Sequence, residues 1–191
     1  QTVSVATLDD DVAGFTLTPS GATVVTEAAG AGNIDDFTLV LDAEPASNVV
    51  LNVQSGDLSE FTVSPATVTF TPANWSTPQT VTITGVDDDF DDGDQTAPAS
   101  VTVNAAASDD DFDAVSGQDV TVTTIDDDAV GFTVVDGGGV TVSESGTNGT
   151  FTVVLDIEPA SAVVFDINVD DASEASRAPA TLTFTPADWN T

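Results

Sequence analysis

Residues 118–128 read Gln-Asp-Val-Thr-Val-Thr-Thr-Ile-Asp-Asp-Asp, a pattern that indicates the fold class. Valine and isoleucine interleave with threonine, which is typical of a β-strand with one face in a core and the other in water. The same alternation returns around Phe37, Val68, Val81 and Val101, with Gly, Pro, Asp or Asn between the runs. Helical spacing is absent from every ten-residue stretch, so we predict an all-β protein that closes as an antiparallel β-sandwich.

The sequence is internally duplicated. Residues 1–27 match residues 118–144, and residues 37–77 match residues 151–191 at about 24 of 41 positions. A repeat this long, returning after roughly 117 residues, indicates tandem modules rather than one large domain.

The alignment of the two copies predicts that the chain contains three segments. Residues 1–11 correspond to the last strand and acidic end of a preceding module, residues 12–128 to one complete module, and residues 129–191 to the first part of a second, homologous module. An incomplete sandwich leaves strand edges and an apolar face open. We favour an excerpt of a longer protein. The alternative is that residues 1–8 of another chain, a copy of a missing strand, are donated head to tail.

The charged residues are almost all acidic. The chain has 33 acidic residues, one basic residue (Arg177) and no histidine, for a formal net charge of −32, yet 40% of its residues are hydrophobic. Such a chain can fold, with its charge gathered in loops. Binding to nucleic acid or to an anionic membrane surface needs cationic side chains, so we expect neither partner, and we expect no membrane insertion.

Three aspartate triplets each follow a strand-like run. They are Asp9, Asp10 and Asp11; Asp87, Asp88 and Asp89; and Asp126, Asp127 and Asp128. Adjacent carboxylates repel one another, and the chain has almost no cation to neutralise them. We therefore predict hard divalent cations in these turns, with Ca²⁺ preferred because it accepts six to eight oxygen ligands in loose geometry.

The densest acidic loop is Val86-Asp87-Asp88-Asp89-Phe90-Asp91-Asp92-Gly93-Asp94. Alternate carboxylates can converge on one ion there, with Gly93 allowing the backbone to curl. The alternative is that acidic loops only solvate the surface. The return of the triplets at fixed strand ends favours calcium over that alternative, whereas both explanations stay open for residues 109–113.

Four motifs together resemble the Calx-β family of calcium-binding β-sandwich domains, known from sodium–calcium exchangers and bacterial surface proteins. They are Val-Val-Thr-Glu at 24–27, Thr-Phe-Thr-Pro at 69–72, the strand and triplet at 81–89, and Val-Thr-Thr-Ile-Asp-Asp-Asp at 122–128. The resemblance covers residues 12–128 and part of 129–191, and it implies an immunoglobulin-like sandwich with several Ca²⁺ ions per module at one tip. The ligands it implicates are Glu27, Asp57, Asp87, Asp88, Asp92, Asp94, Asp126, Asp127 and Asp128, with Glu144 and Asp171 in the second module.

These observations favour a structural role over catalysis. Without His, Cys or Lys, the chain has no base for a serine or cysteine nucleophile, and we expect no enzyme activity. We expect a Ca²⁺-stiffened repeat of a secreted or cell-surface protein, serving as an adhesin stalk, an extender or a filament subunit. Its partners would be neighbouring repeats of the same or identical chains. The alternative is a Ca²⁺-dependent module that binds a carbohydrate or a protein.

Overall fold

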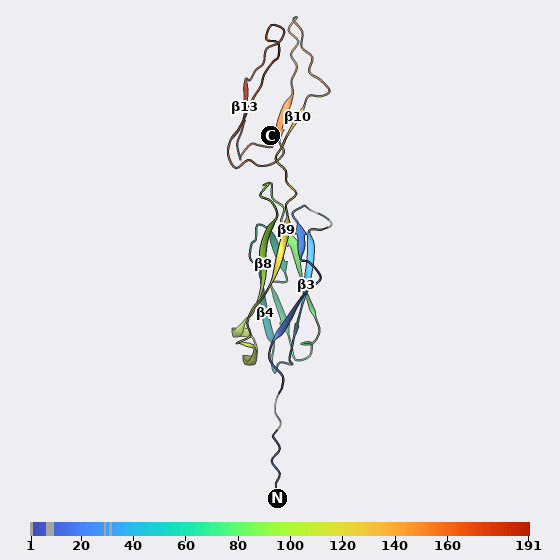
Figure 1. Cartoon of the computed structure of the whole chain (residues 1–191), viewed down its shortest axis with the longest axis vertical. Helices are drawn as coiled ribbons and strands as arrows, with labels where there is room; N and C mark the ends of the chain where they lie inside the picture. The colour runs from blue at the N-terminus through green and yellow to red at the C-terminus, as the bar shows by residue number, and fades with distance from the viewer. Residues whose placement is uncertain (1, 7–9, 29, 31) are drawn as a thin grey trace. The chain divides into compact units, whose positions relative to one another are not determined.

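The computed structural model describes residues 2–6, 10–28, 30 and 32–191 of the chain. The chain divides into two compact units (Figure 1). The first consists of Gln1–Asp88 and Gly93–Asp126, and the second of Asp89–Asp92 and Asp127–Thr191. Within the described residues the regular secondary structure is almost entirely β-strand, as the alternation predicts.

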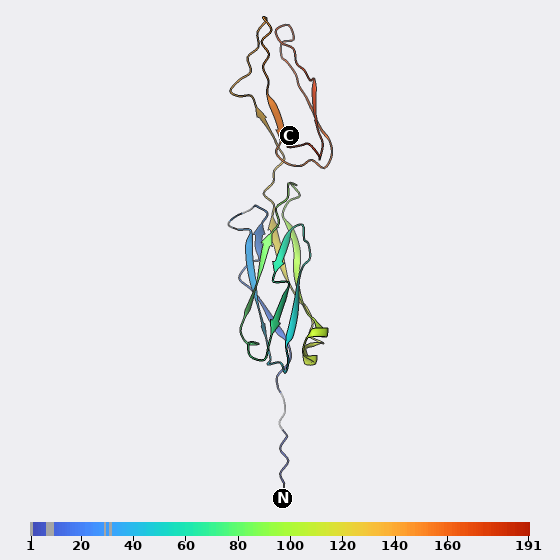
Figure 2. The ribbon, with the colours of Figure 1, turned by 180° about the vertical axis from the view of Figure 1, so that it is seen from behind.

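The first unit is a two-layer β-sandwich, seen from behind in Figure 2. One sheet has the strand order β1-β3-β7-β5 and the other β2-β9-β8-β4-β6. The strands are β1 (Phe15–Pro19), β2 (Val24–Thr26), β3 (Ile34–Leu41), β4 (Val49–Ser55), β5 (Phe61–Ser64), β6 (Thr67–Phe70), β7 (Gln79–Gly85), β8 (Gln95–Val103) and β9 (Gln118–Ile125). Two short 3-10 turns, η1 (Ala105–Ala107) and η2 (Asp110–Phe112), lie between β8 and β9.

One strand pair departs from the antiparallel prediction. Strand β1 pairs with β3 in the first sheet, and the chain then crosses at Ser20 and Gly21 to the other sheet. There β2 runs parallel to β9, with Val25 opposite Thr124. The first part of the repeat therefore contributes a strand to each sheet, and the crossing brings the end of β2 beside the end of β9.

The core of the first unit lies between the two sheets. Its members come from the apolar positions of the alternating strands, and Phe37, Phe61 and Phe70 among them are fully buried. Threonines on the same strands face outward, so the period-two pattern predicts both the core and the wet faces. Burial of several aromatic rings provides the main stabilising term of this sandwich.

The second unit has fewer strands. Strand β10 (Phe132–Val135) pairs with β11 (Thr152–Leu155), and β12 (Val163–Asp166) pairs with β13 (Thr181–Phe184). The ring of Phe165 contacts those of Phe132 and Phe184, at centroid distances of 4.8 and 5.9 Å. Its buried apolar residues are Leu155, Ile157 and Phe184. Residues 2–6, 10 and 11, which belong to the segment predicted to be the last strand and acidic end of a preceding module, are not in a strand here.

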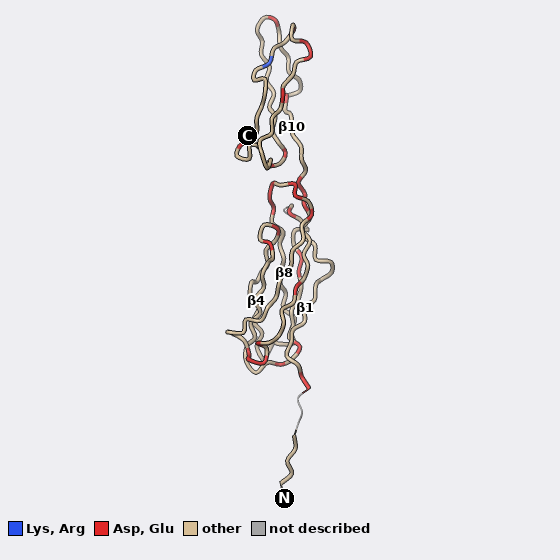
Figure 3. The backbone as a smooth tube through the Cα atoms, turned by 60° about the vertical axis from the view of Figure 1, so that its left-hand side comes forward, with Lys and Arg blue, Asp and Glu red and all other residues tan. Residues whose placement is uncertain are grey.

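Acidic residues gather mainly at the two ends of the first sandwich (Figure 3). The strand faces between those ends carry mostly threonine and valine. None of the helical segments that the structure describes is long and apolar enough to cross a membrane.

Candidate metal centre

Glu27 is the central residue of the candidate site. It directly follows β2, where its backbone N–H donates a hydrogen bond to the carbonyl of Ile125 at 3.1 Å. The parallel β2–β9 pair therefore fixes Glu27 against the start of the terminal triplet. Its side chain is only 3% exposed, an unusual place for a carboxylate.

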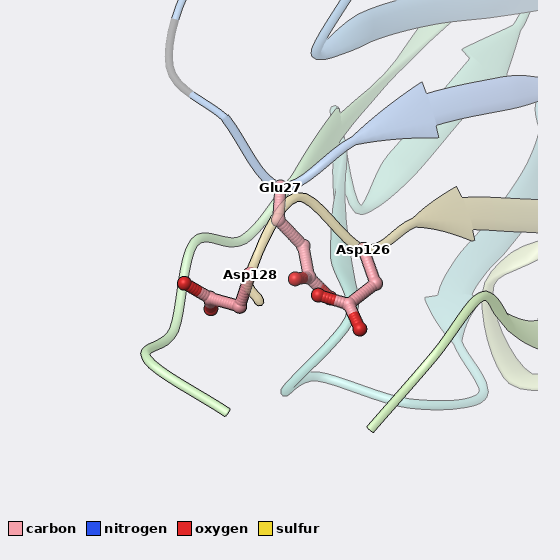
Figure 4. A group of neighbouring side chains, drawn as sticks. All are labelled: Glu27, Asp126 and Asp128. Atoms are coloured by element: carbon pink, nitrogen blue, oxygen red, sulfur yellow. The ribbon is translucent and has the colours of Figure 1, made fainter. Parts of the chain in front are cut away.

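Two groups of carboxylates meet around Glu27. The first is Glu27, Asp126 and Asp128, and the second is Glu27, Glu60 and Asp92. Each residue offers an oxygen that lies within 4.8 Å of those of the other two members. Figure 4 shows the side chains of the first group, with Glu27 and Asp126 converging from the ends of two neighbouring strands.

The acidic loop after β7 is held to the end of β9. The N–H of Gly93 donates to Oδ2 of Asp126 at 2.7 Å, and the N–H of Asp126 donates to Oδ1 of Asp94 at 3.3 Å. Gly93 has a φ of 74°, a left-handed conformation that favours glycine. The glycine thus lets the loop bend back so that its backbone reaches the terminal triplet.

This arrangement concentrates negative charge in a poorly hydrated place. Two carboxylates about 4.8 Å apart repel by about 3 to 4 kcal/mol at an effective dielectric of about 20. Oε2 of Glu27, Oε2 of Glu60 and Oδ2 of Asp128 are themselves buried. Buried charge needs compensation, and the sequence offers only one basic side chain, the exposed Arg177.

The donor set fits a hard cation. Carboxylate and carbonyl oxygens are the ligands of Ca²⁺, at about 2.3–2.6 Å, so two oxygens on one ion lie at most about 5 Å apart. The oxygens of both groups satisfy that limit. The chain has no cysteine or histidine to suit softer metals. Because the groups share Glu27, they can serve neighbouring ions or one ion with several carboxylates.

Glu60 was missed by the sequence reasoning, which favoured Asp57 from the same turn. Glu60 is 5% exposed and belongs to the second group, whereas Asp57 belongs to neither group. Oδ1 of Asp57 accepts hydrogen bonds from the hydroxyl and the N–H of Ser59, which lower the pKa of Asp57. Both acids return in the second repeat, as Asp171 and Glu174, so the sequence holds no signal that selects Glu60 over Asp57.

Asp109, for which solvation and metal binding were both open, forms part of a turn. Its side chain accepts hydrogen bonds from the N–H groups of Asp111 and Ser47, at 3.1 and 2.7 Å. These bonds stabilise the charged form and lower the pKa of Asp109, with the bond from Asp111 contributing most. Asp109 therefore anchors the loop before β9 to the segment before β4.

The other predicted ligands are placed as follows. Asp87 and Asp88 follow β7, with Asp87 exposed and Asp88 half-buried, and the exposed Asp127 lies between two members of the first group. Asp10 and Asp11 are exposed and precede β1, at the opposite end of the first sandwich, and Asp9 lies outside the described residues. In the second unit, Glu144 is exposed, and Oδ1 of Asp171 accepts from Ser173, which lowers its pKa as in Asp57.

No protein-family model and no curated protein matches the sequence. Solved structures with a similar fold include the apo form of the Calx CBD1 domain, with 16% identity over 60% of this chain and 98% of that one, at a TM-score of 0.41. SSP-19 of Caenorhabditis elegans has 22% identity, covers 59% and 99%, and has a TM-score of 0.36. The CsuC–CsuE chaperone–adhesion subunit complex of Acinetobacter baumannii has 9% identity, covers 90% and 86%, and has a TM-score of 0.40. At these values the likeness carries no argument about family or function.

Proposed function

We propose that this chain is a calcium-stabilised structural repeat of a secreted or cell-surface protein, with no enzymatic role. The observation that carries the proposal is the convergence of buried Glu27 and Glu60 with Asp92, Asp126 and Asp128 in a chain with one basic residue. Coulomb repulsion opposes this convergence, and Ca²⁺ is the cation whose ligand preferences match it. The earlier resemblance to Calx-β domains agrees with this assignment.

Calcium would also stiffen the passage from one repeat to the next. Asp126 directly follows β9, and β10 of the second repeat begins at Phe132. Such a short connection contains no Gly/Ser-rich tether, so ions bound to the terminal triplet restrict the backbone between the repeats. A repeat that is rigid when loaded and loose when stripped suits a stalk, an extender or a filament.

We also propose that identical chains can join head to tail by strand donation. Val3 and Val5 are 86% and 80% exposed, and they belong to a segment that copies β9. In the second unit, Val140, Val142 and Phe151 are exposed apolar residues, and the first two precede or lie in the counterpart of β2. Electron microscopy of the purified chain tests this idea: fibres are expected, and only separate particles would refute it.

The calcium proposal is tested by melting the full chain with Ca²⁺, with Mg²⁺ and with EGTA. A ligand that binds only the folded state at about 100 times its Kd stabilises it by about 2.7 kcal/mol. Extracellular modules bind Ca²⁺ with Kd values of about 0.1–1 mM, so about 10 mM Ca²⁺ should stabilise the fold by about 1.4–2.7 kcal/mol. A higher Tm in Ca²⁺ than in Mg²⁺ or EGTA is expected. Equal values in all three would remove the proposal.

A further inference from the structure

The two repeats have the same local structure at the end where each repeat begins, which we call the base. In the first repeat, the N–H of Asp42 donates to the carbonyl of Gly14 at 2.9 Å. In the second, the N–H of Asp156 donates to the carbonyl of Gly131 at 3.1 Å. A Cβ on either glycine would meet the aspartate carboxylate, at 2.5 and 2.4 Å, so both glycines are packed in the same way.

In the second unit the base is occupied by residues 89–92 of the acidic loop, which belong to that unit. The N–H of Glu158 donates to the carbonyl of Asp89 at 2.9 Å. The N–H of Val130 donates to Oδ2 of Asp91 at 3.3 Å. One acceptor is a backbone carbonyl and the other a side-chain oxygen, so both the backbone of the loop and the side chain of Asp91 hold it against the base.

In the first repeat the corresponding place is a cavity. The duplication aligns Val130 with Ala13 and Glu158 with Glu44. Both Ala13 and Glu44 line a cavity of about 520 Å³ in the first unit. Its other walls are the segments around them and the loop before β9, namely Asp11, Val12, Ala43, Pro45, Asp111, Phe112, Ala114 and Val115.

We propose that this cavity is the docking site for a second copy of residues 89–92, presented by another repeat of the same kind. The N–H groups of Glu44 and Ala13 would receive the copies of the Asp89 carbonyl and the Asp91 carboxylate. The shared base geometry and the occupied example in the second unit carry the inference, which does not depend on calcium and so goes beyond the proposed function.

Because the loop and the cavity are both acidic, the strength of docking should depend on the ionic strength. Asp11, Glu44 and Asp111 line the cavity, so an incoming acidic loop meets like charge. The occupied base in the second unit also contains acidic residues, Asp156 and Glu158, and yet accepts the loop. Directed hydrogen bonds supply the attraction, and dissolved salt reduces the repulsion. Docking should therefore strengthen as ionic strength rises, the reverse of an ordinary ion pair.

Amide hydrogen exchange tests the proposal in two chains: the 191-residue chain, and a longer chain in which residues 12–128 are duplicated in tandem. Both are measured by NMR in EGTA with about 0.5 M NaCl, where the Debye length is short. In the 191-residue chain, the amides of Val130 and Glu158 should exchange more slowly than those of Ala13 and Glu44. In the longer chain, one of the two Ala13 amides and one of the two Glu44 amides should slow by about tenfold.

The matched variants change Asp91 in the first copy of the longer chain. Asp91→Asn keeps a carbonyl acceptor and should retain the slow Ala13 amide, whereas Asp91→Ala should lose it while Glu44 stays slow. Equal, fast exchange at both copies of Ala13 and Glu44 would overturn the proposal, as would fast exchange at Val130 and Glu158 in the 191-residue chain. The calcium response of the Tm is read separately, so either idea can fail alone.

Discussion

The two repeats share their sequence pattern but differ in how far they bury it. Phe37 and its counterpart Phe151 occupy the same place in the repeat, yet Phe37 is fully buried and Phe151 is 43% exposed. Glu27 is buried among other carboxylates, whereas its counterpart Glu144 is exposed. The first repeat has β7, β8 and β9 to cover these residues, whereas residues 129–191 contain no counterparts of those strands. The comparison shows that partner strands, rather than the local motif, create both the core and the candidate metal site.

The largest change in the free energy of unfolding should come from a substitution in the core of the first repeat. Phe37→Ala should cost about 3–5 kcal/mol of unfolding free energy because it leaves a cavity between the sheets. Phe151→Ala should cost well under that, because its ring already contacts water. Each repeat contains one tryptophan. Urea unfolding followed by Trp75 fluorescence in a Trp189→Phe background therefore reports the first repeat and the effect of Phe37→Ala. Trp189 fluorescence in a Trp75→Phe background reports the second repeat and the effect of Phe151→Ala. Equal losses for the two alanine variants would break the comparison.

The next largest effect should be the loss of stabilisation by Ca²⁺ when Glu27 is replaced. Glu27→Gln should remove most of the stabilisation that about 10 mM Ca²⁺ provides, about 1.4–2.7 kcal/mol, whereas the matched Glu144→Gln should leave it unchanged. In EGTA the change in Tm should have the opposite sign. Glu27→Gln removes one repelling charge, so its Tm should exceed that of the wild type. Scanning calorimetry of the wild type and both variants, in Ca²⁺ and in EGTA, measures these Tm values. A lower Tm in EGTA, with the calcium response intact, would contradict the assignment.

A smaller loss of calcium stabilisation should distinguish Glu60 from Asp57, the two acidic residues of one turn. Glu60→Gln should lose part of the calcium stabilisation, by about 1 kcal/mol, because its carboxylate belongs to a group with Glu27 and Asp92. Asp57→Asn should retain the calcium response, since its carboxylate holds Ser59. Calcium-dependent melting of the two variants, run side by side, distinguishes them. The opposite ranking would favour Asp57 over Glu60 as the calcium ligand.

The smallest effect concerns Asp109, for which the second repeat has no counterpart among residues 129–191. Its folded pKa lies below the ordinary value of 3.8, so it stabilises the fold above that pH and loses this contribution as pH falls through the folded pKa. The Tm difference between the wild type and Asp109→Asn should therefore shrink as pH falls from about 5 to about 2. A difference independent of pH would show that the charge of Asp109 is not what anchors the loop.

Alternation of apolar and polar residues was enough to predict an all-β sandwich, because it records which side of each strand is buried. It could not predict that β2 runs parallel to β9, since the crossing at Ser20 and Gly21 depends on how two distant strands pack. The same limit applies to the site. Glu27, Asp126 and Asp128 stood out in the sequence by their positions at strand ends. That Glu60 rather than Asp57 joins a candidate group depends on the conformation of the turn that carries both residues.

The most direct test of the account is a calorimetric titration of Ca²⁺ into the EGTA-treated, dialysed full chain. Binding at sub-millimolar to millimolar Kd is predicted, reduced by Glu27→Gln and unaffected by Glu144→Gln, with little competition from equal Mg²⁺. If the wild type and Glu27→Gln gave the same binding heats, or if neither bound Ca²⁺, the carboxylates around Glu27 would not be a calcium site.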